Sequence, residues 1–152
     1  MPDTQATLDK MAAEIFELYQ LVALARMRRP SEADDLSEAE FLALDLLSKE
    51  RTMTIGEVQK RVGVLPAQMS RIVRALEKEG GRGYVECSIN PDDRRRIDVS
   101  LTPAGRAAYE KYRSIRLGSM YESLTVLDPD DRVHFMQMLR QIRTAFEQRL
   151  SE

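Results

Sequence analysis

Apolar and polar residues alternate along two short stretches in the second half of the chain, residues 84–89 and 97–101. The apolar positions are Val85, Cys87 and Ile89 in the first stretch and Ile97, Val99 and Leu101 in the second. A period of two is that of a strand with one buried face. The pattern predicts two strands that pair as a hairpin, with residues 90–95 at its tip.

Two short helices are predicted immediately before the hairpin. The first should span residues 55–62, because Thr54 and Glu57 form a capping box and Gly63 follows. The second is predicted over residues 66–79, since it begins with a proline and two glycines follow it. Its apolar stripe consists of Met69, Ile72, Val73 and Leu76. A short helix, a tight turn and a second helix are typical of a helix-turn-helix, and a following hairpin makes it a winged helix.

Basic and polar side chains occupy the places where a winged helix meets nucleic acid. On the face of the second helix opposite the apolar stripe, the candidates for contact with bases in the major groove are Gln68, Ser70, Arg71 and Arg74. The two arginines could instead pair with carboxylates such as Glu77. Arg94, Arg95 and Arg96 stand at the hairpin tip and suit phosphates or a narrow minor groove. Alone they would indicate a solvated charge cluster, but their place after a helix-turn-helix favours a nucleic-acid contact.

Longer amphipathic helices are predicted on both sides of this core. Residues at spacings of three and four form an N-terminal seam of Leu8, Met11, Ile15, Leu18, Val22 and Ala25 and a C-terminal stripe of Val133, Met136, Leu139, Ile142 and Phe146. A further helix, Pro103 to about Leu124, follows Thr102 as cap, with Ala104, Ala108, Tyr112 and Ile115 as its apolar positions. Another, between Ser37 and Lys49, begins with a capping box.

These seams predict a homodimer, although each could instead close within one chain. The residues that we expect at the dimer interface are Leu8, Met11, Ile15, Leu18, Val22, Ile142 and Phe146. The predicted fold is therefore mainly helical with a small β-hairpin. It is a single domain over residues 1–152, with a winged-helix core at 37–102 and dimerisation helices at 1–29 and 103–152. Two-fold symmetry would place paired helices about 34 Å apart and predicts an inverted-repeat DNA site.

Charge is distributed in agreement with DNA binding, although the whole chain carries a net charge of −2. Residues 54–106 contain ten Lys and Arg against seven Asp and Glu, a net of +3. The chain contains no apolar run long enough for a membrane span and no secretory pattern at its N-terminus, so we expect a cytoplasmic protein without a membrane partner.

Enzymatic and metal-binding functions find little support in the sequence. It contains no glycine-rich phosphate loop, and one Cys and one His leave few candidates for a metal site or catalytic pair. We expect no enzyme activity, no cofactor and no metal. Cys87 could be a redox sensor, but its place on an apolar strand face favours a buried structural residue. The alternative function is a winged-helix module that binds proteins without binding DNA.

The run GVLPAQMSRIVRALEKEG, followed by the hairpin and DDRRRIDVSLTPAG, resembles the MarR family of bacterial transcription regulators. Its most specific motif, Asp-x-Arg and then Leu-Thr-x-x-Gly, is matched by Asp93, Arg95, Leu101, Thr102 and Gly105. The resemblance implies a mostly helical homodimer, commonly a repressor, in which Arg95 enters the minor groove and Asp93 orients it.

The resemblance also implies that a small phenolic or anionic effector can release such regulators from DNA. Tyr19, Arg26, Tyr112 and Arg116 are the candidates for lining its cleft, and ordinary packing or surface roles suit them equally well.

Two features depart from the pattern of the family. Leu65 replaces the usual Ser or Thr cap of the second helix, which typically costs about 1 kcal/mol. The glycine-rich segment GGRGY leads into the hairpin, which predicts a connection about which the hairpin can pivot.

Overall fold

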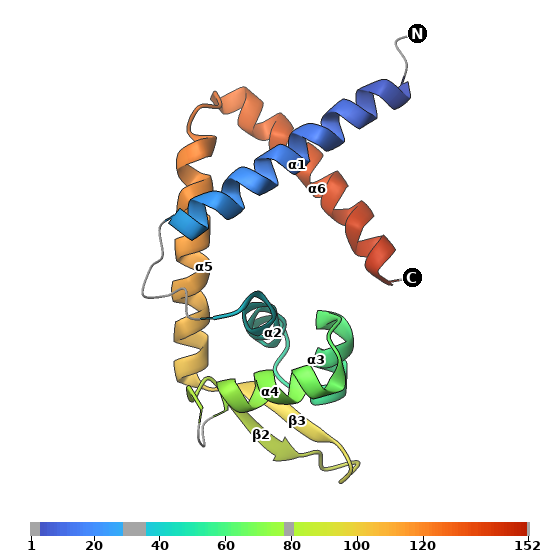
Figure 1. The fold of residues 1–152 in the computed structure, drawn as a ribbon, viewed down its shortest axis with the longest axis vertical. Helices are drawn as coiled ribbons and strands as arrows, with labels where there is room; N and C mark the ends of the chain where they lie inside the picture. The colour runs from blue at the N-terminus through green and yellow to red at the C-terminus, as the bar shows by residue number, and fades with distance from the viewer. Residues whose placement is uncertain (1–3, 29–35, 78–80, 152) are drawn as a thin grey trace. The chain divides into compact units, whose positions relative to one another are not determined.

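The computed structural model describes residues 4–28, 36–77 and 81–151 (Figure 1). The chain divides into two compact units, Met1–Ser114 and Ile115–Glu152. Its elements are α1 (Thr4–Arg28), α2 (Glu38–Lys49), β1 (Met53–Thr54), α3 (Ile55–Val62), α4 (Pro66–Leu76), β2 (Val85–Ile89), β3 (Ile97–Leu101), α5 (Pro103–Leu124) and α6 (Pro129–Ser151). This mainly helical architecture with a small sheet confirms the predicted fold class. In the described residues no helix is long and apolar enough to cross a membrane.

Side-chain caps fix where the helices of the core begin. The Glu40 N–H donates to the Ser37 hydroxyl (3.2 Å), and the Ser37 N–H donates to the Glu40 carboxylate (2.8 Å). Thr54 and Glu57 form the same reciprocal pair at the start of α3. Each pair satisfies two backbone donors that the first turn of a helix leaves without partners. Both predicted capping boxes are therefore confirmed.

The predicted hairpin is part of a three-stranded antiparallel sheet in the order β1-β3-β2. Val85 pairs with Leu101 and Ile89 with Ile97 along the hairpin, and Met53 of β1 pairs with Val99. The sequence did not predict β1, because two residues are too few to display a period.

The common apolar face of the hairpin is buried only at the end nearest α5. Val85 and Val99 are fully buried, whereas Ile89 is 67% exposed and Ile97 is 45% exposed. Both isoleucines lie near the tip, where the strands extend past the hydrophobic core. The expectation that all the alternating apolar residues share a buried face is thus wrong at the tip.

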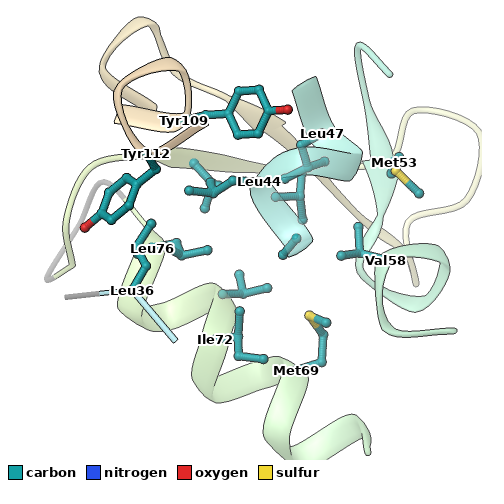
Figure 2. Close-up of a cluster of buried hydrophobic side chains, with 14 residues drawn as sticks. Leu36, Leu44, Leu47, Met53, Val58, Met69, Ile72, Leu76, Tyr109 and Tyr112 are labelled. Carbon is teal, nitrogen blue, oxygen red and sulfur yellow. The ribbon is translucent and has the colours of Figure 1, made fainter. Parts of the chain in front are cut away.

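The hydrophobic core lies inside the first unit and joins its helices to the sheet (Figure 2). It consists of Leu36, Ala43, Leu44, Leu47, Met53, Val58, Met69, Ile72, Val73, Leu76, Val85, Val99, Tyr109 and Tyr112. All four residues of the apolar stripe predicted for α4 belong to this core, as expected. The stripe predicted for α5 is confirmed at Tyr112 and wrong at its ends, where Ala104 and Ile115 are exposed. Ala108 is partly buried, and Gly105 and Tyr109 are buried positions that were not predicted.

The helix α4 ends at Leu76, three residues before the predicted end. Glu77 already has an extended backbone (φ −67°, ψ 156°) and forms an isolated bridge with Val85. Residues 78 and 79, which the prediction placed at the end of the helix, and Gly80, which was predicted to stop it, lie outside the described residues. Gly83 and Tyr84 donate N–H bonds to Glu77 (3.0 Å) and Leu76 (2.8 Å). These bonds tie Gly83 and Tyr84 to the end of α4, and pivoting of the hairpin about this connection stays a prediction.

A close backbone approach joins the start of α5 to the segment that precedes β2. The Thr102 hydroxyl donates to the Gly83 carbonyl (2.6 Å) and accepts the Gly105 N–H (3.0 Å), while the Thr102 N–H donates to the Tyr84 carbonyl (3.0 Å). A Cβ atom at Gly105 would lie 1.9 Å from the Tyr84 carbonyl oxygen. The Thr-x-x-Gly motif is therefore explained by a cap and by the absence of a side chain where two backbones meet.

Candidate nucleic-acid interface

The helix α4 has one buried face and one exposed face, as its sequence period predicts. Gln68, Ser70, Arg71 and Arg74 are all exposed. The Ser70 hydroxyl donates to the Pro66 carbonyl (3.1 Å), which leaves its oxygen lone pairs free to accept. Glu77, the carboxylate considered as an alternative partner for the arginines, forms no ion pair with them in the described part of the chain.

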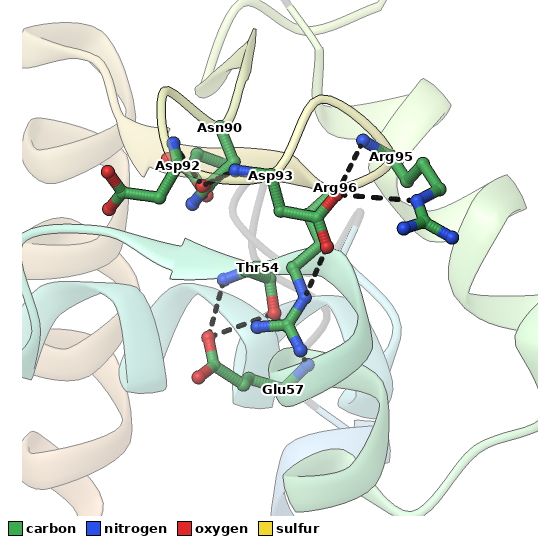
Figure 3. A network of polar contacts seen from close by, with 8 residues as sticks. Thr54, Glu57, Asn90, Asp92, Asp93, Arg95 and Arg96 are labelled. Atoms are coloured by element: carbon green, nitrogen blue, oxygen red, sulfur yellow. Dashed lines mark hydrogen bonds and ion pairs between the residues drawn. The ribbon is translucent and has the colours of Figure 1, made fainter.

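The tip of the β2–β3 hairpin, residues 90–96, is closed by the Asn90 side chain (Figure 3). Its carbonyl oxygen accepts the N–H groups of Asp92 and Asp93, each at 2.9 Å, and its amide nitrogen donates to Asp98 at 2.9 Å. The Asn90 N–H donates to the Arg96 carbonyl (3.0 Å). An asparagine that bonds backbone groups two and three residues onward stabilises a turn. We call residues 90–96 the wing tip. The role of Asn90 in holding it was not predicted from the sequence, because that role depends on the folded turn.

Asp93 contacts two of the three arginines that follow it at the wing tip. Its Oδ1 accepts the Arg95 N–H (3.1 Å) and lies 3.7 Å from Arg95 Nε, while its Oδ2 lies 3.6 Å from Arg96 Nε (Figure 3). The Arg95 side chain is nevertheless 95% exposed. Ion pairs this exposed contribute little to stability. Their effect is to bias the direction of the guanidinium groups, which remain available to an external partner.

A groove of about 580 Å³ separates the wing tip from the start of α3. Its lining residues are Thr54, Ile55, Gly56, Glu57, Lys60, Arg95, Arg96 and Ile97. Hydrogen bonds from the Thr54 N–H and hydroxyl lower the pKa of Glu57 below its ordinary value, with smaller contributions from the charges of Arg96 and Arg61. Glu57 is therefore ionised at neutral pH and gives Arg96 an opposite charge on the neighbouring helix.

Cys87 is partly buried on β2, somewhat less than predicted. Burial, with smaller contributions from the nearby Glu77 carboxylate, raises the pKa of its thiol to about 11. Because the thiolate is the reactive form, a protonated thiol at neutral pH favours the structural interpretation over redox sensing. Among the described residues, no group of three His, Cys, Asp or Glu could hold a metal ion.

The four effector candidates have different environments. Tyr112 is buried in the core, Tyr19 is exposed on α1, and Arg26 lies 3.6 Å from Glu38. Arg116 belongs to the second unit. Tyr112 therefore has a packing role, and effector binding by these residues stays a prediction.

An exposed basic face on the second helix of a helix-turn-helix, next to an arginine-bearing hairpin, defines a winged-helix DNA-binding protein. Residues 36–97 match the model of the MarR family. The HTH-type transcriptional regulator YwhA of Bacillus subtilis is 31% identical over 123 residues, which are 77% of this chain and 86% of YwhA. The chain thus belongs to the MarR family and is a DNA-binding transcription regulator, not an enzyme.

Two further proteins resemble the chain over most of its length. The HTH-type transcriptional repressor MdtR of Bacillus subtilis is 24% identical over 147 residues, 97% of this chain and 88% of MdtR. The solved structure of BpsR from Bordetella bronchiseptica, whose DNA binding is regulated by 6-hydroxynicotinic acid, has 25% identity and a TM-score of 0.60. That likeness covers 88% of this chain and 98% of BpsR.

Proposed function

We propose that this regulator is a homodimeric repressor that binds an inverted-repeat operator. Gln68, Ser70, Arg71 and Arg74 contact base edges in the major groove, and Arg94, Arg95 and Arg96 lie in or beside the minor groove. The observation that carries the proposal is the wing tip, where Asn90 closes the turn and Asp93 orients two exposed arginines. A cationic tip that is already ordered loses less conformational entropy on binding phosphates than a flexible loop would, and so binds them more tightly.

The flanking helices support the homodimer. None of the described residues of α1 or α6 is buried, although both helices carry large apolar side chains at helical spacing. Leu8, Met11, Ile15, Leu18, Ile142 and Phe146 are all exposed, and Val22 is partly exposed. Long helices with an uncovered apolar stripe require a partner. A second copy of the chain supplies matching stripes. The resulting two-fold dimer presents two α4 helices, one for each half-site.

The same geometry supports repression. A dimer that covers a promoter excludes polymerase by occupancy alone, and the similar protein MdtR is a repressor. We further propose release by a small phenolic or anionic effector, because 6-hydroxynicotinic acid regulates the DNA binding of the similar protein BpsR. Such a ligand must bind the DNA-free conformation more tightly than the DNA-bound one, since equal affinity shifts no equilibrium.

Selection of bound fragments from a random duplex pool, repeated at a low and a high salt concentration, tests this function. The expected product is an inverted repeat with half-sites about one helical turn apart, bound by two chains in sedimentation equilibrium. Arg71→Ala should reduce the discrimination between sequences, whereas Arg95→Ala should lower the affinity for all duplexes by a similar factor. Enrichment of an asymmetric site by a single chain would refute the homodimer. Salt-independent or absent affinity would favour the alternative, a winged-helix module that binds proteins.

A further inference from the structure

Leu65 occupies the N-cap of α4 but cannot act as a cap. Its backbone is extended (φ −70°, ψ 152°), its carbonyl accepts the Met69 N–H (2.9 Å), and its side chain makes no capping hydrogen bond. Ser, Thr, Asp and Asn are preferred at this position because their oxygen atoms accept an N–H of the first turn. Leucine therefore forgoes a stabilising bond that most residues at this position would supply.

The Leu65 side chain contributes nothing to the hydrophobic core. It is 73% exposed, and it belongs neither to the core cluster nor to the partly buried apolar residues that pack against the cluster. Its neighbours Pro66 and Ala67 are exposed too. The start of α4 thus exposes three apolar residues, which are followed by exposed polar and basic side chains at Gln68 and Arg71.

The chemistry of the major groove suits this apolar surface. In a helix-turn-helix, the first residues of the second helix are those that reach base edges. The only apolar group that base edges display in the major groove is the C5-methyl group of thymine. A leucine at the leading end of the helix can cover that methyl group and exclude water from it, which a serine, asparagine or aspartate cap would do poorly.

We propose that Leu65 contacts a thymine methyl group in each half-site and is a specificity-determining residue. This inference rests on the proposed docking of α4 in the major groove and adds one base preference to it. At one position of each half-site the protein selects an A·T pair with thymine on the strand nearest Leu65. The contact is apolar, so the preference persists at high salt, unlike the contributions of Arg94, Arg95 and Arg96.

Replacement of thymine by deoxyuridine tests the contact, because the two bases differ only by the methyl group. Affinities are measured for the selected duplex and for duplexes in which each symmetric pair of thymines is replaced in turn. Burial of one methyl group corresponds to roughly a fourfold change in affinity, or about 15-fold for two half-sites. The affinity of the wild-type protein should fall by about 15-fold when one particular pair of thymines is replaced, and by less at the other pairs. Leu65→Ala should bind the thymine and deoxyuridine duplexes equally.

Two further variants separate this contact from effects on folding. Leu65→Ser supplies the missing cap, so it should raise the melting temperature and still lose the discrimination between thymine and deoxyuridine. Ile89→Ala truncates another exposed apolar residue, at the end of β2, and should discriminate between thymine and deoxyuridine as the wild type does. Equal sensitivity to deoxyuridine in the wild type and Leu65→Ala would overturn the contact alone. Failure of the wild type to bind any selected duplex would overturn the proposed docking as well.

Discussion

Replacement of Gly105 by alanine should destabilise the fold where α5 meets the segment before β2. The added Cβ atom would lie 1.9 Å from the carbonyl oxygen of Tyr84 and 2.7 Å from its carbonyl carbon. These are backbone atoms, so no side-chain rotation can relieve the overlap. The Tyr84 carbonyl also accepts the Thr102 N–H at 3.0 Å, and moving the carbonyl away would stretch that bond.

The magnitude follows from three contributions. Overpacking of a well-packed site typically costs about 1–3 kcal/mol. Loss of one backbone hydrogen bond adds about 1 kcal/mol. Because alanine has a higher helix propensity than glycine, the substitution also offsets about 1 kcal/mol of this destabilisation. The free energy of unfolding of Gly105→Ala should therefore fall by roughly 1–3 kcal/mol, which corresponds to a decrease in melting temperature of about 2–12 °C for a chain of this size.

Urea unfolding followed by far-ultraviolet circular dichroism measures this change, at one fixed protein concentration because dimers unfold in a concentration-dependent way. Gly118→Ala is the matched control, since Gly118 lies in the same helix and a Cβ there would meet nothing within 4 Å. The control should be unchanged or more stable by about 0.5–1 kcal/mol. Equal stability of Gly105→Ala and Gly118→Ala would refute the close approach.

Three further predictions concern Asp45, Cys87 and Asn90. Burial raises the pKa of Asp45, but hydrogen bonds from Lys49 and Tyr109 outweigh that effect, so the pKa is lowered overall. Ionised Asp45 therefore stabilises the fold above the unfolded-state pKa near 3.9, and this stabilisation is lost as pH falls through the folded-state pKa. Tyr109→Phe should therefore lower the free energy of unfolding by about 1 kcal/mol at pH 7, and the difference from the wild type should shrink in acid unfolding experiments; a constant difference would contradict this. The raised pKa of Cys87, about 11, predicts slow alkylation by iodoacetamide in native buffer and fast alkylation in urea, and equal rates would count against it. Asn90→Ala should weaken DNA binding several-fold, measured by fluorescence anisotropy. The melting temperature should change little, because the bonds of Asn90 hold the wing tip and the adjoining end of β3, away from the hydrophobic core; unchanged affinity would show that the tip needs no preorganisation.

The features that could be predicted from sequence are those governed by residues close in the chain. The capping boxes at Ser37 and Thr54 depend on a residue three positions later, and the buried stripe of α4 depends on a period of 3.6. The left-handed backbone at Gly63 (φ 78°) likewise follows from its position after the last turn of α3. Local hydrogen bonding and side-chain direction determine all of these.

The features that could not be predicted depend on where distant segments meet. Asn90 bonds Asp98 across the hairpin, and Gly105 faces Tyr84 from a different element. Periodicity places Ile89 and Ile97 on the core side of their strands, but it does not reveal that the core ends before them. The burial of Tyr109, which was not among the predicted positions on α5, follows from its hydrogen bond to Asp45 on α2 and its stacking on Phe41.

The salt dependence of DNA binding by Arg95→Ala tests the central claim most directly. Each lost phosphate contact should reduce the log–log slope by about 0.9, so a symmetric dimer should lose about 1.8 and should bind all duplexes more weakly at low salt. Arg149→Ala removes the same charge from the last turn of α6 and should leave both quantities unchanged. A slope for Arg95→Ala equal to that of the wild type and of Arg149→Ala would contradict the assignment of the wing tip to DNA.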